Sequence, residues 1–465
     1  MLKIHRTLIV FLLTAVLAAA TAAADTRSLH DRTLENGLKV IVKEDRRVPV
    51  AVSMLLYKIG SMDEVNGVTG VAHVLEHMMF KGTAKVPPGE FSKIIARAGG
   101  RDNAFTSKDY TGYHQSVHKS QLPLVVEMEA DRMANLILRE EEFAKEIRVV
   151  MEERRQRTED NPHALLYEQL VATAFVANPY RRPIVGWMND LENMRVEDAQ
   201  AFYDAWYAPN NAVLVVVGDI DPEEVFALAE RHYGAIPSRA LPERKPQTEP
   251  QQKGIKRLLL KAPAELPFIA MAYHVPVVEN IDTDWEPFAL SVLSGVLDGS
   301  TAARLPRELV RNTRVANSVN TSYDSLKRGP GLFFVAGTPA DGRTADDLEA
   351  AWREQVRRLI QEGVSEEELA RVKAQVVASF VYQQDSVYAQ ASQLARLYSV
   401  GLPYDAMDTL LQKFQAVTAE QVREVARRYL IDDALTVAVL DPQPIGERRP
   451  PVEPAADVDE GGSPR

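Results

Sequence analysis

The chain has no cysteine among its 465 residues, which excludes disulfide bonds and a lipid anchor attached through an N-terminal cysteine. It also has no dense run of basic residues, and its formal net charge is −11. This charge balance argues against nucleic acid or an anionic membrane surface as a partner.

Only one long apolar run is present, at residues 8–20, and it is too short for a comfortable transmembrane helix. Lys3 and Arg6 precede this run, and small residues follow it up to Ala24. This order is typical of a signal peptide at 1–24, cleaved near Ala24. We therefore expect a mature protein without stable membrane insertion in the periplasm, where a lack of thiols avoids oxidation. An uncleaved membrane anchor is the alternative.

The remaining composition is that of an ordinary globular protein, with 46% hydrophobic and 26% charged residues. Four prolines at 237, 242, 246 and 250 lie among polar residues and predict a linker at 237–255. This linker separates domains at 25–236 and 256–441. Six prolines and two adjacent glycines at 442–465 predict a disordered tail.

The two domains resemble each other in sequence. Residues 197–219 and 419–441 each indicate a helix, a tyrosine, a polar turn and a β-branched strand. Tyr207 aligns with Tyr429, and the same offset aligns Ala212 with Ala434. The similarity indicates duplication of one α+β unit, although chance can produce such an echo in a protein of this size.

Strand and helix patterns mix without strict alternation in the first domain. We predict strands at 38–43 and 50–57, and helices at 68–80, 89–98, 122–134 and 140–157. The simplest packing is an α+β fold with an antiparallel sheet flanked by helices in each half.

His73, Glu76 and His77 place three ionisable groups in the apolar segment 68–80. On a helix the two histidines lie about 40° apart, and Glu76 lies in the same arc. Two imidazoles at this spacing can share a tetrahedral metal ion, and the carboxylate can reach a water bound to it. The order His-x-x-Glu-His reverses the common His-Glu-x-x-His and preserves its geometry. A single histidine in an apolar segment is usually a core residue whose hydrogen bonds are satisfied. Burying two histidines and a glutamate together is costly unless they are paired or bound to metal.

A third ligand is required, and the segment 140–157 offers glutamates. Glu146 and Glu153 are separated by two helical turns and fall about 20° from each other, at the edge of the apolar stripe of this segment. Glu152 points about 100° further round, toward solvent. Helix geometry therefore favours Glu153 as the ligand, with Glu146 as a support behind the site. A solvated charged face is the alternative for these glutamates taken alone.

These residues together resemble the motif of the pitrilysin-type (M16) zinc metallopeptidases, and in particular their bacterial processing-peptidase-like members. The sequence His-Val-Leu-Glu-His at 73–77 is followed, on the later segment 140–157, by Glu153. The segments RAGGRDNAFTSKDYTGYH at 97–114 and NPYRRPIVG at 178–186 are also similar to family segments. The resemblance therefore covers nearly all of the mature chain.

The resemblance implies one half of a clam shell, built from two homologous halves. It implies one Zn²⁺ per chain, held by His73, His77 and Glu153, with Glu76 as general base, although such a ligand set also accepts manganese or cobalt. It further implies that the strand containing Asn103 and Ala104 binds an unfolded peptide substrate as an added strand.

The second half departs from the family pattern. Residues 291–299, which correspond to the metal helix, contain no His or Glu, and Val310 and Asn317 stand where active members carry a substrate-contacting Arg and Tyr. We therefore expect a zinc endopeptidase that is the catalytic subunit of a heterodimer, completed by a paralogous non-catalytic subunit with that Arg and Tyr. A non-catalytic binding or assembly subunit is the alternative. A homodimer, and either peptide degradation or precursor processing, also stay open at this point.

Overall fold

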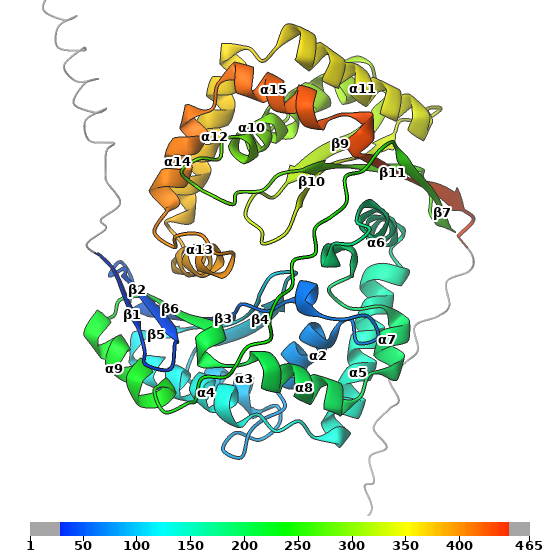
Figure 1. Cartoon of the computed structure of the whole chain (residues 1–465). Helices are drawn as coiled ribbons and strands as arrows, with labels where there is room; N and C mark the ends of the chain where they lie inside the picture. The colour runs from blue at the N-terminus through cyan, green and yellow to red at the C-terminus, as the bar shows by residue number, and fades with distance from the viewer. Residues whose placement is uncertain (1–27, 446–465) are drawn as a thin grey trace, which may run out of the picture.

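The computed structural model describes residues 28–445 and folds them into two halves, each with one β-sheet and helices packed on it (Figure 1). The signal peptide predicted at 1–24 lies outside the described residues, as does most of the predicted tail, although Pro442 and Gln443 belong to the last strand. Across residues 28–445, no helix combines the length and the apolar character that a membrane crossing requires.

The first half contains a six-stranded sheet of order β1-β2-β6-β3-β5-β4. Its strands are β1 (Leu29–Thr33), β2 (Lys39–Glu44), β3 (Val50–Tyr57), β4 (Arg101–Thr106), β5 (Thr111–His118) and β6 (Ala212–Gly218). Its α-helices are α2 (Val71–Met78), α3 (Glu90–Arg97), α4 (Leu122–Asn135), α5 (Glu140–Arg154), α6 (Pro162–Ala174), α7 (Met188–Asn193), α8 (Val196–Trp206) and α9 (Pro222–Tyr233). Short helical turns are η2 (Ser61–Asp63), η3 (Lys119–Gln121), the π-helical η4 (Arg155–Glu159), η5 (Pro179–Arg181) and η6 (Pro209–Asn211).

The second half contains a five-stranded sheet of order β7-β11-β8-β10-β9. Its strands are β7 (Lys256–Pro263), β8 (Phe268–Val275), β9 (Ala316–Tyr323), β10 (Gly331–Pro339) and β11 (Leu435–Gln443). Its helices are α10 (Glu286–Asp298), the π-helical η7 (Pro306–Asn312), α11 (Ala345–Glu362), α12 (Glu366–Gln383), α13 (Val387–Ser399), α14 (Met407–Ala416), α15 (Ala419–Tyr429) and the turn η8 (Asp432–Ala434). Between the halves, residues 237–255 form neither helix nor strand.

The expected α+β fold with two homologous halves is confirmed, and the sheets add one detail to it. Each sheet is antiparallel except for one parallel pair, β2 with β6 and β7 with β11. A parallel pair needs a long crossover connection. The pattern of a single strand does not reveal which distant strand it will pair with, so the sequence could not predict these two pairs.

The duplication is present, but the offset between the halves is one residue larger than the sequence alignment indicated. Helix α8 corresponds to α15, the turn η6 to η8, and strand β6 to β11. In each pair, the element of the second half begins one residue later than it would if Tyr207 corresponded to Tyr429. The strands agree with the larger offset, because it relates Leu214 to Val437, and both face the helices of their own half. A slip of one residue would turn every side chain to the opposite face. Tyr207 therefore corresponds to Leu430, and its pairing with Tyr429 was wrong by one position.

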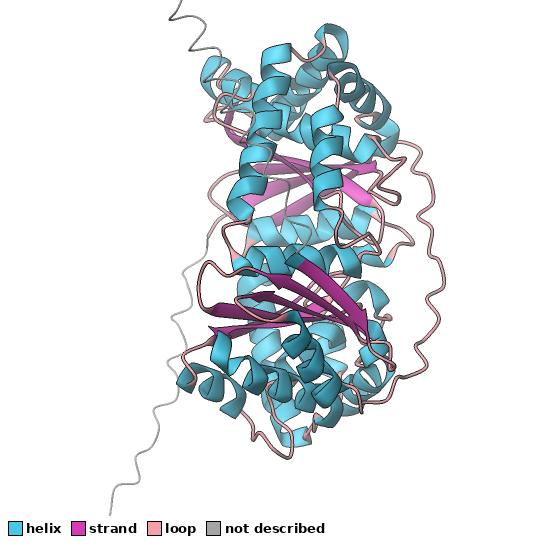
Figure 2. Cartoon of the chain, turned by 90° about the vertical axis from the view of Figure 1, so that its left-hand side faces the viewer, coloured by secondary structure: helices cyan, strands magenta, loops and turns pink. Residues whose placement is uncertain are grey.

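Each sheet is covered on one face by helices of its own half and on the other by a helix of the opposite half. Helix α13 of the second half packs on β3 and β6, through Leu394 and its neighbours. Helix α6 of the first half packs on β8 and β11, through Leu166 and Leu170. Figure 2 shows helices in the layer between the two sheets. This reciprocal covering joins the halves through two shared apolar cores.

Candidate metal centre

Helix α2 begins at a fixed place because the side chain of Glu64 and a close backbone approach at Gly70 hold its first turn. Gly70 has a positive φ of 91°, and a Cβ there would lie 2.5 Å from the carbonyl oxygen of Val185. The buried carboxylate of Glu64 accepts hydrogen bonds of 2.9 Å from the backbone N–H groups of Gly70 and Ala72. Burial raises the pKa of Glu64 to about 8, against the opposing effect of these two hydrogen bonds. The glycine also explains why the helix starts at Val71 and not at residue 68.

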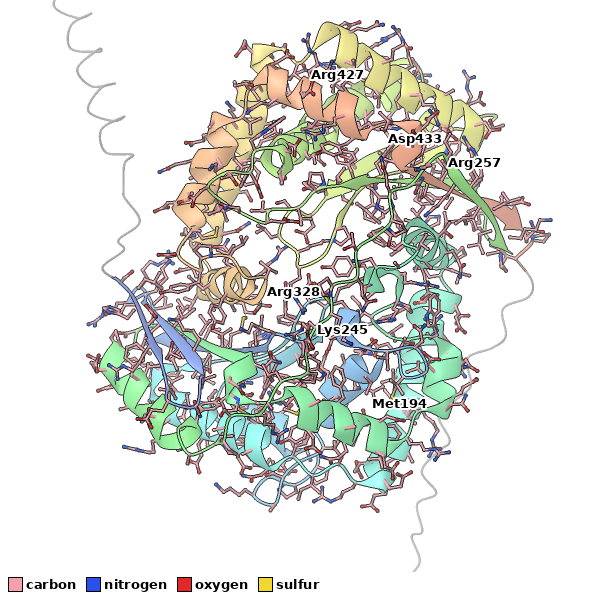
Figure 3. The ribbon with its side chains drawn as sticks, viewed as in Figure 1. Met194, Lys245, Arg257, Arg328, Arg427 and Asp433 are labelled. Atoms are coloured by element: carbon pink, nitrogen blue, oxygen red, sulfur yellow. The ribbon has the colours of Figure 1, made fainter. Side chains whose placement is uncertain are left out.

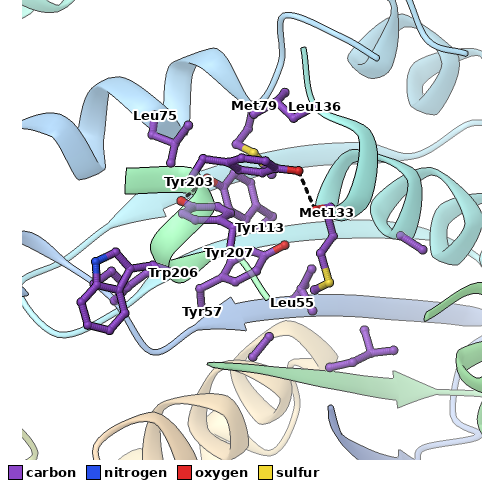
Figure 4. Packing of buried hydrophobic residues seen from close by; sticks show 14 of the residues in the cluster. Leu55, Tyr57, Leu75, Met79, Tyr113, Met133, Leu136, Tyr203, Trp206 and Tyr207 are labelled. Atoms are coloured by element: carbon purple, nitrogen blue, oxygen red, sulfur yellow. Dashed lines mark hydrogen bonds between the residues drawn. The ribbon is translucent and has the colours of Figure 1, made fainter. Parts of the chain in front are cut away.

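One face of α2 is apolar and packs on the core of the first half. Leu75, Met78 and Met79 are fully buried there. Figure 4 shows Leu75 and Met79 beside the tyrosines of this core, where Tyr113 and Tyr207 share a hydrogen bond of 3.0 Å. The apolar packing fixes the rotation of α2 about its axis, and it directs the face with His73, Glu76 and His77 away from the core.

The structure brings together the three residues that the sequence indicated as ligands. Nε2 of His73 lies 3.7 Å from Oε1 of Glu153, and Nε2 of His77 lies 3.5 Å from Oε2 of Glu153. One ligand atom from each residue falls within 4.8 Å of the others. Atoms at these separations can all lie about 2 Å from one tetrahedral ion. The cluster therefore has the geometry and the donor atoms of a metal site.

Protonation of the two imidazoles differs. Burial lowers the pKa of His73 to about 3, so the ring is neutral at neutral pH, which is the form that binds metal. Burial also opposes protonation of His77, but its hydrogen bond to Glu146 and the charge of Glu153 outweigh this effect and raise its pKa. A metal ion would replace the proton that these carboxylates favour on His77.

Glu146 stands behind His77, as the helix geometry suggested. Its Oε2 lies 3.2 Å from Nδ1 of His77, and its Oε1 accepts a hydrogen bond of 2.6 Å from Lys81. The contact to Nδ1 leaves Nε2 of His77 free to face Glu153 and fixes the orientation of the ring. Lys81 was not identified from the sequence, because it follows the end of α2 and reaches Glu146 only through the fold.

Helix α5 gives adjacent residues different environments. Glu152 is exposed and contacts Arg155 and Gln156, whereas Glu153 has a side chain only 17% exposed. Arg157, in the π-helical turn that follows, lies 2.6 Å from Oε1 of Glu153. This i,i+4 ion pair was not predicted, although its spacing on a helix is a signal for it.

Glu76 faces the edge of the sheet. Its Oε2 accepts a hydrogen bond of 2.5 Å from Oγ1 of Thr106, at the end of β4. Burial raises the pKa of Glu76, and the bond from Thr106 opposes part of that shift. Thr106 was missed as a site residue, because nothing in the sequence pairs the end of β4 with α2.

Asn103 and Ala104 lie on β4, which is the outer strand of its sheet and is bonded only to β5. Asn103 is opposite His114 and is exposed, while Ala104 is opposite Tyr113 and is partly buried. The other edge of β4 thus has backbone groups that no strand among residues 28–445 satisfies.

The second half has no counterpart of the cluster in the part of the chain that the structure describes. Within residues 28–445, His73, His77 and Glu153 form the one group of three His, Asp or Glu side chains close enough to hold a single ion. Val310 packs partly buried against the core of the second half, and Asn317 is exposed on the outer strand β9.

Comparison with known proteins places both halves in one family. Residues 39–187 match the family Insulinase (Peptidase family M16), and residues 193–376 match the family described as Peptidase M16 inactive domain. The zinc protease PqqE of Helicobacter pylori is 32% identical over 421 residues, which are 88% of this chain and 92% of that protein. A protein named uncharacterized zinc protease in Mycobacterium leprae is 29% identical over 432 residues, covering 91% of this chain and 94% of that protein.

Solved structures agree with these relatives. The crystal structure of a protease from Helicobacter pylori has a TM-score of 0.84 at 30% identity and covers 89% of this chain and 99% of that one. A putative M16-like peptidase from Alicyclobacillus acidocaldarius has the same fold, with a TM-score of 0.79 at 21% identity over 89% of this chain and 98% of that one. With both halves matched and near full-length similarity to these proteins, the chain belongs to peptidase family M16.

Proposed function

We propose that this protein is a zinc-dependent endopeptidase that hydrolyses unfolded peptides in the periplasm. The observation that carries the proposal is the cluster of His73, His77 and Glu153 with the carboxylate of Glu76 on the same helix face. The names of the relatives, which are zinc proteases, support zinc as the ion. The neutral ring of His73 is ready to bind a metal without first losing a proton.

Glu76 is the general base of the proposed reaction. Zinc in this site would acidify a coordinated water and polarise the peptide carbonyl. Glu76 accepts the proton of the attacking water and then donates it to the leaving amine. Thr106 holds the Glu76 carboxylate through a hydrogen bond of 2.5 Å and so limits the positions from which it can transfer a proton.

The free edge of β4 is the proposed peptide-binding strand. An extended peptide there can pair with the backbone of Asn103 and Ala104. Because Thr106 on the same strand bonds to Glu76, a peptide on this edge comes close to the general base. Folded proteins present few unpaired strands, so this mode of binding selects unfolded chains.

The test is cleavage of an unstructured peptide by the zinc-loaded protein and by Glu76→Gln. We expect the variant to retain about one zinc per chain and to lose at least about a thousandfold in turnover, because it cannot accept a proton. Glu141→Gln, at the exposed start of α5, serves as the control with normal turnover. Full activity of Glu76→Gln would contradict the proposal.

We further propose that a paralogous subunit completes the enzyme. Residues 193–376, which include much of the second half, match a domain described as inactive. This segment carries Val310 and Asn317, neither of which can supply a guanidinium or a phenol. A lost oxyanion donor typically slows catalysis by a hundredfold or more. The isolated chain should therefore be weak and should gain activity with a paralogue that carries Arg and Tyr. If the pair cleaves peptide equally well with Glu76→Gln, the chain is a non-catalytic binding or assembly subunit.

A further inference from the structure

Arg328 belongs to the loop between β9 and β10 of the second half, but its side chain lies on the first half. Figure 3 shows it in the middle of the molecule, where the two halves meet. Its guanidinium donates hydrogen bonds of 2.9 and 3.1 Å to the two carboxylate oxygens of Asp63. It also donates a bond of 3.0 Å to the backbone carbonyl of Asp109. The side chain is only 16% exposed, so these bonds are largely shielded from water.

The first of these contacts leads to the start of the metal-binding helix. Asp63 ends the turn η2, and the next residue is Glu64. The Glu64 carboxylate caps α2 through the N–H groups of Gly70 and Ala72, and Ala72 immediately precedes His73. A shift of η2 would therefore move the cap of α2 and, with it, the first histidine.

The second contact leads to the general base. Asp109 lies in the turn between β4 and β5, and Thr106 at the start of this turn donates to Glu76. The same turn is tied to η2, because the carbonyls of Ser107 and Lys108 accept from the backbone N–H groups of Ser61 and Met62 at 3.1 and 3.0 Å. Arg328 thus bridges two segments that each hold α2, one at its cap and one at Glu76.

The loop that carries Arg328 is itself held in place. Tyr180 donates a hydrogen bond of 2.5 Å to the Asp109 carboxylate and accepts one of 3.0 Å from the N–H of Gly329. A Cβ at Gly329 would lie 2.9 Å from the Tyr180 ring, so the loop backbone approaches this ring closely. The contact between the halves at this point has little room to shift.

We propose that Arg328 of the second half is a positioning residue for the metal centre of the first half. It holds η2 and the 107–110 turn in register, and these segments in turn fix the start of α2 and the Glu76 carboxylate. The second half, which has no ligand cluster of its own among residues 28–445, thereby contributes to the metal site through one arginine.

The test compares Arg328→Met with Gln390→Leu. Gln390 is also buried between the halves, where it donates a hydrogen bond of 2.8 Å to Asp45, but it touches neither η2 nor the 107–110 turn. Both variants remove a polar contact between the halves. Only Arg328→Met should weaken zinc binding, by about tenfold, which is typical for loss of a partner outside the ligands. Only Arg328→Met should speed amide hydrogen exchange in residues 71–78.

Competition with a chelator measures the zinc affinity, and exchange is followed on the metal-free proteins by mass spectrometry. If Arg328→Met does not fold, Asp63→Asn keeps the shape of the Asp63 side chain, weakens its pairing with Arg328 and also that with Arg244, and should give the same two changes. Equal zinc affinity and equal exchange in residues 71–78 for the Arg328 or Asp63 variant and Gln390→Leu would overturn the inference. The inference rests on the proposed zinc site, but the exchange measurement does not require zinc. A parent protein that binds no zinc contradicts the proposed function and leaves the exchange result to decide the role of Arg328.

Discussion

At the residue scale, the surroundings of each carboxylate determine what it can do. Glu152 and Glu153 are neighbours on α5, but Glu152 is 56% exposed and pairs with Arg155, while Glu153 faces both histidines. Glu76, one residue before His77, instead bonds to Thr106 and faces the sheet edge. Three chemically identical groups thus have three separate roles available to them.

Replacement of Thr106 by Val should lower turnover by about tenfold, because Glu76 loses the donor that orients its carboxylate. The KM for an unstructured peptide should change little, since Val keeps the shape and the strand propensity of Thr. Thr106→Ser retains the hydroxyl and is the matched control, with turnover close to the parent. Steady-state kinetics of the three proteins decides this, and equal turnover in all three would refute the role of Thr106.

The sequence could predict which members of the proposed ligand cluster share a helix face, because helical periodicity is local. His73 with His77, and Glu146 with Glu153, each lie on a single helix, so their spacing alone shows which of them share a face. Thr106 reaches Glu76 from a strand 30 residues away. No spacing rule connects a strand to a helix at that distance, and only the fold could identify this contact.

At the scale of elements, α5 is held in place directly beside its proposed ligand. Arg154 follows Glu153, and its guanidinium donates bonds of 2.9 and 3.0 Å to Glu168 of α6 and one of 2.8 Å to the carbonyl of Gly186. Both Arg154 and Glu168 are almost fully buried. The π-helical turn begins at the next residue, and such turns are frequent at functional sites.

Replacement of Arg154 by Met should lower the free energy of unfolding by about 3–5 kcal/mol, because the Glu168 carboxylate is left buried and unpaired. Arg155→Met is the control, since Arg155 is exposed and its loss should cost less than about 0.5 kcal/mol. Urea denaturation of the two variants measures the difference. Similar losses in both would show that the buried pair does not anchor α5.

The boundaries of the helices follow from contacts that the sequence does not reveal. The predicted helix at 68–80 is confirmed as α2, but it starts at Val71 because Gly70 lies against Val185, which is distant along the chain. The strand at 50–57 is confirmed at its predicted bounds. Its apolar run, interrupted only by Ser53, is typical of a strand buried on both faces and defines it without distant contacts.

At the scale of the whole molecule, polar contacts add to the two shared apolar cores that join the halves. Asp45, directly after β2, accepts hydrogen bonds from Arg47 and from Gln390 of α13. The bonds from Arg47 lower the pKa of Asp45 to about 2, against the opposing effect of burial. The ionised carboxylate is therefore stabilised in the folded state.

This pKa shift predicts a dependence of stability on pH. The pKa of Asp45 is lower in the folded chain than its value of about 3.9 in an unfolded chain. Its contribution is therefore fully present above about pH 4 and is lost as the pH falls toward 2. Asp45→Asn should be less stable than the parent at pH 6, and the difference should shrink below pH 4. Denaturant unfolding of the parent and of Asp45→Asn at pH 6 and at pH 3 measures this difference in stability.

The control for this prediction is Asp385→Asn. Asp385 pairs with the same Arg47 at 3.1 Å but is 74% exposed, so its removal should change the free energy of unfolding little at either pH. A difference between Asp45→Asn and the parent that stays constant from pH 6 to pH 3 would contradict the assignment.

Duplication and two halves could be predicted from the sequence, but not how the halves exchange helices. Helices α6 and α13 show apolar faces that fit any nearby sheet, and nothing in their sequences indicates the sheet of the opposite half. The predicted offset between the halves was also wrong by one position, because it was based on matching two tyrosines. The correct register depends instead on which face of the sheet each strand side chain points to.

The metal content of Glu153→Gln and Glu152→Gln tests the central claim most directly. The two residues are adjacent on α5, so both variants alter the same helix by the same change in charge. Each purified protein is loaded with zinc, freed of unbound ion and analysed by atomic emission. The account predicts about one zinc per chain for the parent and for Glu152→Gln, and a large loss for Glu153→Gln. Zinc retained by Glu153→Gln but lost by Glu152→Gln would contradict it.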